Sequence, residues 1–219
     1  MSRPRETDRQ AYSGQTRQKL LDAAAAEFAR AGYLGANVNT ISSAAGYAKG
    51  TIYNYFPSKR ALLLALIQDA AREHLDFMVA QVSLEAEPAR RLAAFFQAGF
   101  DFVVQQAQVA QVLFNTLHDP DASIKTYVFE CYQPMFQFLS GEILAPGMAQ
   151  GVLRPVEPEA MAMLLMTIYL GTASPRNLEG KPFLNARQVA DLVLKGLERS
   201  PDGPQRTLPA SQEVNHDHV

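Results

Sequence analysis

The stretch from Asn37 to Lys59, NVNTISSAAGYAKGTIYNYFPSK, constrains the fold more than any other part of the chain. Its first half spaces apolar residues as on one face of a short helix, and Gly46 follows where the chain needs a tight turn. A second helix is predicted from Ala48 to Phe56, and Pro57 ends it, because the residue before a proline is disfavoured in the α region. Two short helices joined by a glycine turn are typical of a helix-turn-helix, whose second helix enters the major groove of DNA.

The outward side of the second predicted helix carries side chains suited to a polyanion. Lys49 adds a cation to the positive end of that helix, where backbone N–H groups already suit a phosphate. Gly50 lets the backbone approach a duplex closely, while Ile52 and Phe56 are predicted to face inward. The residues predicted to donate to phosphate oxygens or to contact base edges are Thr51, Tyr53, Asn54 and Tyr55. Because short helical hairpins occur in many folds, a solvated face above two packed aromatic residues is the alternative interpretation.

This stretch resembles the signature of the tetracycline-repressor (TetR) family. The match spans about residues 15–67, and the rest of the chain agrees with the family only in helical character and length. The matching residues are Gly32-Tyr33, Ile41, Ala44-Ala45-Gly46, Lys49-Gly50-Thr51-Ile52-Tyr53, Tyr55-Phe56 and Ser58-Lys59. The resemblance implies an all-α homodimeric transcription regulator, usually a repressor that a small ligand releases from DNA. It also implies DNA-facing positions at Lys49, Gly50, Thr51, Tyr53, Asn54, Tyr55 and Lys59.

Several positions depart from the family pattern. Ala36 stands where threonine or serine is frequent, so one hydroxyl–phosphate contact is missing. Asn37, a good N-cap residue, is predicted to replace part of that contact and is therefore the eighth predicted DNA-binding residue. Tyr47 occupies the place of a buried valine, and Ala48 that of a serine. Ala36 and Ala48 are the features that favour the alternative function, a small-molecule-binding or scaffolding protein with a relic helix-turn-helix.

Positive charge gathers at the amino end of the chain. Residues 1–60 hold nine Lys and Arg against four Asp and Glu, or +5, and residues 61–219 hold eleven against eighteen, or −7, which sums to −2. A basic end on an acidic body suits binding of a polyanion. The single cysteine, Cys131, excludes an intrachain disulfide. We see neither the apolar core of a signal peptide nor the run of ~18 apolar residues that crosses a bilayer, and therefore expect a cytoplasmic protein.

The chain is predicted to have four parts. These are a disordered basic arm at 1–13, a helix-turn-helix domain at 14–60, a helical ligand-binding and dimerisation domain at 61–199, and a disordered tail at 200–219. The arm is either a floppy tail or an added contact to phosphate or to the minor groove. A helix at about 15–31 precedes the motif, and a long helix from the Ser58 cap to Gln81 links head and body. Two body helices are predicted to end near residues 106 and 117. A longer one is predicted to start at a cap at Asp121 or Ser123 and to be kinked at Pro134 and Pro146. The last two are predicted at 158–173 and 186–199.

The segment at 157–173 is apolar on nearly every side, so it must be buried on every side. Packing between its own core and a second subunit satisfies that requirement. The last helix, at 186–199, carries an apolar face as well. We therefore predict a homodimer that pairs these two helices with their copies as a four-helix bundle.

The body is richer in Phe, Tyr and Met than a plain helix bundle needs. Isolated polar groups among these residues predict an apolar cavity, although each such residue is more often part of a core. The predicted ligand-binding residues are Phe96, Phe100, Asn115, His118, Tyr127, Tyr132, Phe136, Met166 and Tyr169. We expect a largely apolar or aromatic small-molecule effector, held by one or two of the polar groups.

Motifs for catalysis and metal binding are missing from the sequence. There is no glycine-rich phosphate loop, no G-x-S-x-G and no H-E-x-x-H, and the histidines lack metal-ligand spacing apart from His216 and His218 in the tail. Cys131 is interpreted as a structural thiol. The sequence therefore predicts no enzyme, no cofactor and no metal site. It favours a ligand-responsive transcription regulator, more a repressor than an activator, that binds a near-palindromic double-stranded DNA operator as a dimer.

Overall fold

The computed structural model describes residues 6–173 and 182–197, with side chains from Ser13 onward. The described residues form helices joined by short turns, so the predicted all-α class is confirmed. The predicted tail at 200–219 and the first residues of the arm lie outside the described residues, as do the last two residues of the helix predicted to reach Arg199.

The first helix is longer than predicted. α1 covers Glu6–Gly35, so residues 6–13, which the sequence assigned to a disordered arm, are helical. The prediction ended the arm at residue 13 and began the first helix at about residue 15, just after Gly14. A single glycine costs a helix only about 1 kcal/mol relative to alanine, and no proline stands between Glu6 and Gly35. Gly32, the predicted stop, has φ 68° and ψ 173° and kinks α1 rather than ending it.

The motif has a helix, a turn and a short 3₁₀ segment. α2 covers Val38–Ala44, with Asn37 as its predicted N-cap, and η1 covers Thr51–Asn54. The prediction of a second α-helix from Ala48 to Phe56 is wrong in this respect, because Gly50 has φ 95° and turns the chain out of the helical region. Backbone hydrogen bonds of the 3₁₀ type follow, from Tyr53 N to the Gly50 oxygen and from Tyr55 N to the Ile52 oxygen, both 3.0 Å. We call α1, α2 and η1 the head.

The long linking helix and the body helices follow the predicted order. α3 covers Lys59–Val82 and is capped by Ser58, whose hydroxyl accepts from Ala61 N at 3.0 Å. Between Pro134 and Pro146, where kinks were predicted, the chain widens into a π-helix. The remaining elements are α4 Pro88–Gln105, α5 Ala107–Leu117, α6 Ala122–Gln137, η2 Phe138–Leu144, α7 Ala145–Ala149, α8 Pro158–Ala173 and α9 Ala186–Leu197. We call α4 to α9 the body.

Two clusters of buried residues hold these helices together. The head cluster joins α1, α2 and η1 to the first turns of α3 and also takes in Val112 of α5 and Ile124 and Val128 of α6. The body cluster fills the space between α3, α4, α8 and α9. The head therefore packs directly on helices of the body, and the predicted boundary at residue 60 is not a gap in the core.

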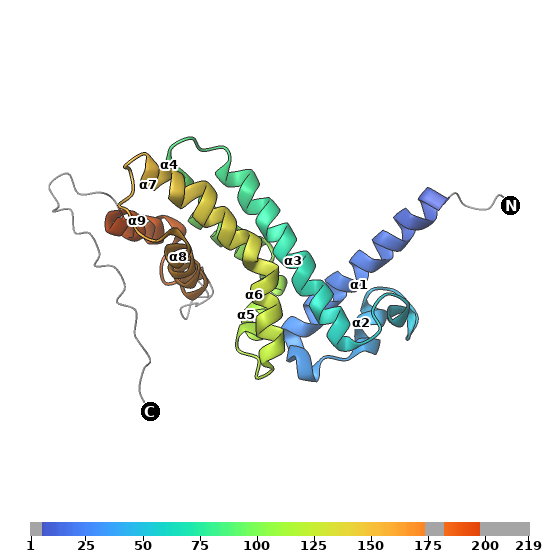
Figure 1. Ribbon diagram of the computed structural model, residues 1–219. Helices are drawn as coiled ribbons and strands as arrows, with labels where there is room; N and C mark the ends of the chain where they lie inside the picture. The colour runs from blue at the N-terminus through green and yellow to red at the C-terminus, as the bar shows by residue number, and fades with distance from the viewer. Residues whose placement is uncertain (1–5, 174–181, 198–219) are drawn as a thin grey trace, which may run out of the picture.

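Figure 1 shows α3 running from the head to the far end of the body, with α8 and α9 at the end opposite α2. Within the described residues, no helix combines the length and the apolar character that crossing a membrane requires.

Candidate nucleic-acid interface and ligand cavity

The turn of the helix-turn-helix is fixed by side-chain hydrogen bonds. The Ser42 hydroxyl, which is fully buried, donates to the Ala48 carbonyl at 3.1 Å. The Tyr47 hydroxyl donates to Thr16 Oγ1 of α1, also at 3.1 Å. Asn37 Oδ1 accepts from Asn39 N at 2.9 Å, which confirms its predicted role as the cap of α2. The two family departures at Tyr47 and Ala48 are thus parts of the turn itself.

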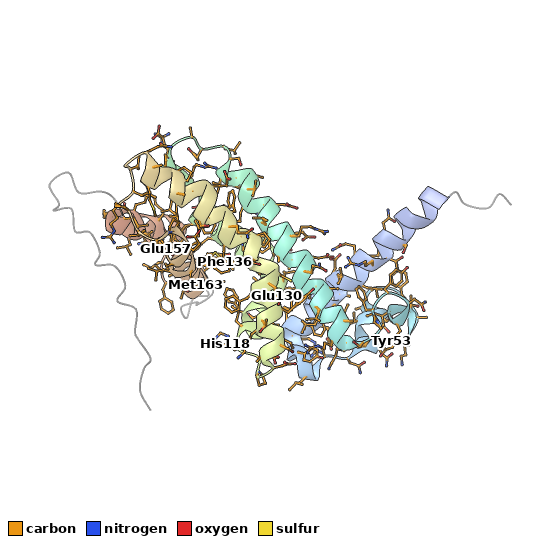
Figure 2. All side chains as sticks on the ribbon, in the orientation of Figure 1. Tyr53, His118, Glu130, Phe136, Glu157 and Met163 are labelled. Atoms are coloured by element: carbon orange, nitrogen blue, oxygen red, sulfur yellow. The ribbon has the colours of Figure 1, made fainter. Side chains whose placement is uncertain are left out.

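The η1 segment divides its residues between core and solvent. Ile52 is fully buried and Phe56 nearly so, as predicted. Lys49, Tyr53 and Asn54 are exposed, and Tyr53 leaves 52% of its surface open. Figure 2 shows Tyr53 at the outer edge of the head, away from α6. Of the remaining predicted DNA-binding residues, Gly50, Thr51, Tyr55 and Lys59 are half-buried, and Asn37 is exposed.

Lys59 has intramolecular partners that the sequence did not predict. Its ammonium donates to the carbonyls of Leu34, at 3.0 Å, and Ala36, at 3.1 Å, and lies 5.0 Å from the centroid of the Tyr33 ring. Two of the three ammonium protons are therefore directed at the carboxyl end of α1. Lys59 therefore fastens the start of α3 to the end of α1, and these two hydrogen bonds use two of its three protons.

An ion pair also joins the head to α3. Arg17 Nη1 of α1 lies 2.6 Å from Asp69 Oδ2 of α3, and the Arg17 guanidinium carbon lies 5.6 Å from the centroid of the Phe56 ring. One side chain of α1 thus contacts both the end of the motif and the linking helix.

A cavity of about 70 Å³ lies between α3, α4, α5, α6 and α8. Within residues 6–173 and 182–197, three of its lining side chains carry nitrogen or oxygen atoms: His74, Tyr132 and Tyr169. The remaining lining residues are Phe102, Val103, Ala110, Leu113, Phe114, Leu117, Val128, Phe129, Phe136, Met166 and Leu170. The cavity wall is therefore apolar apart from one polar cluster.

The three polar side chains contact one another in a row. His74 Nδ1 lies 3.3 Å from the Tyr132 hydroxyl, and His74 Nε2 lies 3.3 Å from the Tyr169 hydroxyl. The Tyr169 hydroxyl donates to the carbonyl of Gly99 on α4 at 3.0 Å. The His74 ring stacks on Phe102, with ring centroids 3.9 Å apart and planes 8° apart. These contacts fix the imidazole in position and orientation.

Burial keeps all three groups neutral. It lowers the pKa of His74 from its usual 6.5 to about 3, and it raises the pKa of the Tyr132 and Tyr169 hydroxyls above the usual 10. The physical cause is the loss of hydration, which disfavours the charged form of each group. Among the described residues, the cavity therefore offers neutral hydrogen-bonding groups and no charged side chain.

Comparisons with known proteins identify the family of the head. Residues 20–66 match the family described as "Bacterial regulatory proteins, tetR family". A curated relative, the "Fatty acid metabolism regulator protein" of Bacillus subtilis, is 26% identical over 136 residues, which are 62% of this chain and 70% of the relative. The "HTH-type transcriptional activator FasR" of Mycolicibacterium smegmatis is 30% identical over 132 residues, 57% of this chain and 58% of that protein. The chain belongs to the TetR family.

A solved structure supports the fold of the TetR-family chain beyond the head. The transcriptional regulator FadR from Bacillus subtilis in complex with stearoyl-CoA superposes with a TM-score of 0.72 at 21% identity, over 81% of this chain and 95% of that one. The relatives are transcriptional regulators rather than enzymes. The TetR-family protein is accordingly a DNA-binding transcriptional regulator, and the alternative of a scaffolding protein with a relic motif finds no support among the relatives.

The cavity of this TetR-family regulator includes some of the predicted ligand-binding residues and not others. Tyr132, Phe136, Met166 and Tyr169 line it. Phe96 and Phe100 are packed in the body cluster and are not among the residues that line the cavity.

The other three predicted residues lie nearer the head. Asn115 and His118 are exposed at the carboxyl end of α5 and border a groove against α1, and Tyr127 packs on the head cluster. Figure 2 labels His118 near the lower end of α5. The correction has one physical reason. Aromatic or polar character alone does not determine which way a residue faces on a helix packed on several sides.

The sequence reasoning missed His74, the central polar residue of the cavity. A signal was available, because His74 stands at helical spacing from Ile67, Ala70 and Met78, on the buried face of α3. A histidine on an apolar helix face needs a hydrogen-bond partner. That requirement points to a polar group on a facing helix, which Tyr132 and Tyr169 supply.

Proposed function

We propose that this TetR-family regulator is a homodimeric repressor that binds a near-palindromic operator and leaves it when a small, largely apolar effector occupies the cavity. The observation that carries the proposal is the motif surface. Lys49, Tyr53 and Asn54 project from a turn that is anchored from below by Ile52 and Phe56. A rigid, cationic and exposed segment of this kind suits the major groove.

The proposed contacts differ in role. Lys49, Asn37 and the remaining proton of Lys59 would bind phosphates, which supply affinity for any sequence. Tyr53 and Tyr55 would position η1 on the backbone. Asn54, together with the Gly50-Thr51 edge, is proposed to contact base edges, because an amide side chain pairs well with adenine in the major groove.

The effector is proposed to lie between α3, α5, α6 and α8. Its apolar part would contact the carbon atoms that make up most of the cavity wall, and its polar group would meet His74, Tyr132 or Tyr169. The stearoyl-CoA in the Bacillus subtilis FadR structure gives one example of a ligand with an apolar chain in this fold. A cavity of about 70 Å³ must widen to admit a long chain, and that widening would move α6.

The dimer is proposed to form through α8 and α9. α8 buries Leu165, Met166 and Tyr169 against its own body but leaves about half of Met163 and Leu164 exposed, and Leu192 of α9 is 63% exposed. Exposed apolar side chains gathered on neighbouring helices mark an interaction surface. In Figure 2 Met163 lies on α8, at the end of the molecule opposite Tyr53. Such a dimer would hold two heads apart for two operator half-sites.

The domain division stays a proposal: a DNA-binding head at 14–60 and a ligand-binding and dimerisation body at 61–199. We also propose that the protein acts in the cytoplasm, where its operator lies.

A gel-shift titration with the DNA that flanks its own gene tests the function. Specific retardation, competed by the same duplex and not by an unrelated one, is expected. Equal affinity for both duplexes at about 150 mM salt would contradict it.

A further inference from the structure

The polar cluster of the cavity has a direction, because one of its ends can only accept a hydrogen bond. The Gly99 carbonyl has no proton, so the Tyr169 hydroxyl, 3.0 Å away, must be the donor. Gly99 also lets the Tyr169 ring approach α4, since a Cβ atom at this position would lie 2.6 Å from Tyr169 Cε2. The last hydrogen bond of the chain, from Tyr169 to Gly99, is therefore fixed by the packing of α4 against α8.

The donation by Tyr169 determines the tautomer of His74. The Tyr169 hydroxyl donates its hydrogen bond to the Gly99 carbonyl, so its oxygen accepts a hydrogen bond from His74 Nε2 at 3.3 Å. A neutral imidazole carries one N–H group only. With that proton on Nε2, His74 Nδ1 is an acceptor, and the Tyr132 hydroxyl at 3.3 Å must donate to it.

The reverse direction makes one hydrogen bond fewer. If Tyr169 donated to His74 Nε2, the hydroxyl could no longer donate to Gly99, and Tyr169 is almost fully buried, with no access to water. Buried polar groups are nearly always paired. Only the direction from Tyr132 through His74 and Tyr169 to Gly99 makes all three of these hydrogen bonds.

We infer that the cavity selects an apolar ligand whose polar group is a neutral hydrogen-bond donor, such as an alcohol, over one that can only accept. This inference rests on the proposed function, in which the cavity holds the effector. Tyr132 has used its only proton on His74, so its oxygen offers lone pairs alone. Apart from His74, Tyr132 and Tyr169, the lining side chains that the structure describes consist of carbon, hydrogen and, in Met166, sulfur. A ketone or ether oxygen would face the Tyr132 lone pairs without a proton between them.

The tautomer is tested first, without any ligand. Histidine is labelled with ¹⁵N in the rings of the full-length protein, and His74 is assigned by comparison with His74→Gln. We expect the proton on Nε2 and an unprotonated Nδ1. A His74 ring protonated on Nδ1 would overturn the inference, whatever the cavity binds.

Ligand preference is tested with three compounds of equal size: octan-1-ol, octan-2-one and heptyl methyl ether. We expect octan-1-ol to bind about three- to tenfold more tightly than the other two, the worth of one hydrogen bond. In Tyr169→Phe the His74 tautomer is no longer fixed, so the preference should fall to about one. Equal binding of the three by the unchanged protein, or an undiminished preference in Tyr169→Phe, would overturn the inference and leave the proposed function intact. Binding of none of them would remove the proposed role of the cavity.

Discussion

Arg60 Nη1, on the first turn of α3, lies 2.8 Å from Asp121 Oδ2, the N-cap residue of α6. Arg60 Nη2 also donates to the Ser123 hydroxyl at 2.6 Å. Hydrogen bonds from Ser123 and from Arg60 hold the pKa of Asp121 down at about 2, so this carboxylate is charged at neutral pH. The helix that enters the head is thus bonded to the start of the helix that lines the cavity.

This contact predicts a role for Arg60 in coupling the effector to DNA. We expect Arg60→Gln to leave effector affinity within about twofold, since α6 lines the cavity a turn or more beyond Asp121. Release of the operator by a saturating effector should become weaker, because part of the coupling free energy, about 1–3 kcal/mol in typical cases, passes through this contact. Operator affinity is measured with and without effector, and Arg90→Gln, on α4, is the control. Full release by Arg60→Gln would exclude the contact from the coupling.

Lys49 and Asn54 are predicted to affect DNA binding in different ways. Lys49→Ala should weaken binding to all duplexes and reduce the slope of log affinity against log salt by about one, since one phosphate contact is lost. Asn54→Ala should cost about 1–3 kcal/mol on the operator and little on an unrelated duplex. Fluorescence anisotropy at several salt concentrations measures both effects. Arg90→Ala serves as the control for charge. Unchanged affinity and unchanged sequence preference in both variants would refute the assignment.

His74 predicts how stability depends on pH. Its pKa is about 3 in the folded protein and about 6.5 when unfolded, so below pH 6.5 the unfolded state takes up a proton that the folded state does not. The free energy of unfolding should therefore fall as pH drops from 6.5 toward 3, by at most about 1.4 kcal/mol per pH unit from this group. Denaturant unfolding between pH 7 and 5 measures the slope. His74→Gln should flatten it, whereas His118→Gln, at an exposed site, should not; equal slopes in all three proteins would contradict the prediction.

The sequence predicted what neighbouring residues determine and missed what packing determines. The caps at Asn37 and Ser58, and the inward side of η1 with Ile52 and Phe56, depend on residues within a turn of one another. The φ of Gly50 was not predictable in this way, since glycine fits a helix start and a left-handed turn alike.

The residues of α4 that line the cavity are likewise determined by packing. Phe96, Phe100 and Phe102 stand on one helix, yet only Phe102 lines the cavity. The rotation of α4 about its axis, set by its packing against α3, α8 and α9, determines which of these rings lines the cavity. The local sequence pattern does not determine that rotation. His74 was missed for a related reason, because its partners Tyr132 and Tyr169 are distant in sequence.

Gly99 is predicted to be essential for the fit of Tyr169. A Cβ atom at position 99 would lie 2.6 Å from Tyr169 Cε2 and 2.9 Å from Cζ. Because the Tyr169 ring is fully buried and cannot move aside, Gly99→Ala should destabilise the protein by about 1–3 kcal/mol, as overpacking does. Gly171→Ala, exposed in the last turn of α8 with open space around it, should be neutral or stabilising by up to about 1 kcal/mol. Thermal unfolding of both variants decides, and equal melting temperatures would contradict the prediction.

Leu164 tests the proposed dimer. It lies half-exposed on α8 beside a groove formed with α9, and burying a leucine side chain contributes about 1.5–3 kcal/mol. Leu164→Glu places a charge in that interface and should shift the protein from dimer to monomer at micromolar concentration. Operator affinity should fall with it, because each monomer reaches one half-site only. Leu84→Glu, at a site that is 79% exposed outside α8 and α9, provides the matched control. Sedimentation velocity measures the assembly state, and a Leu164→Glu dimer as stable as the control would place the interface elsewhere.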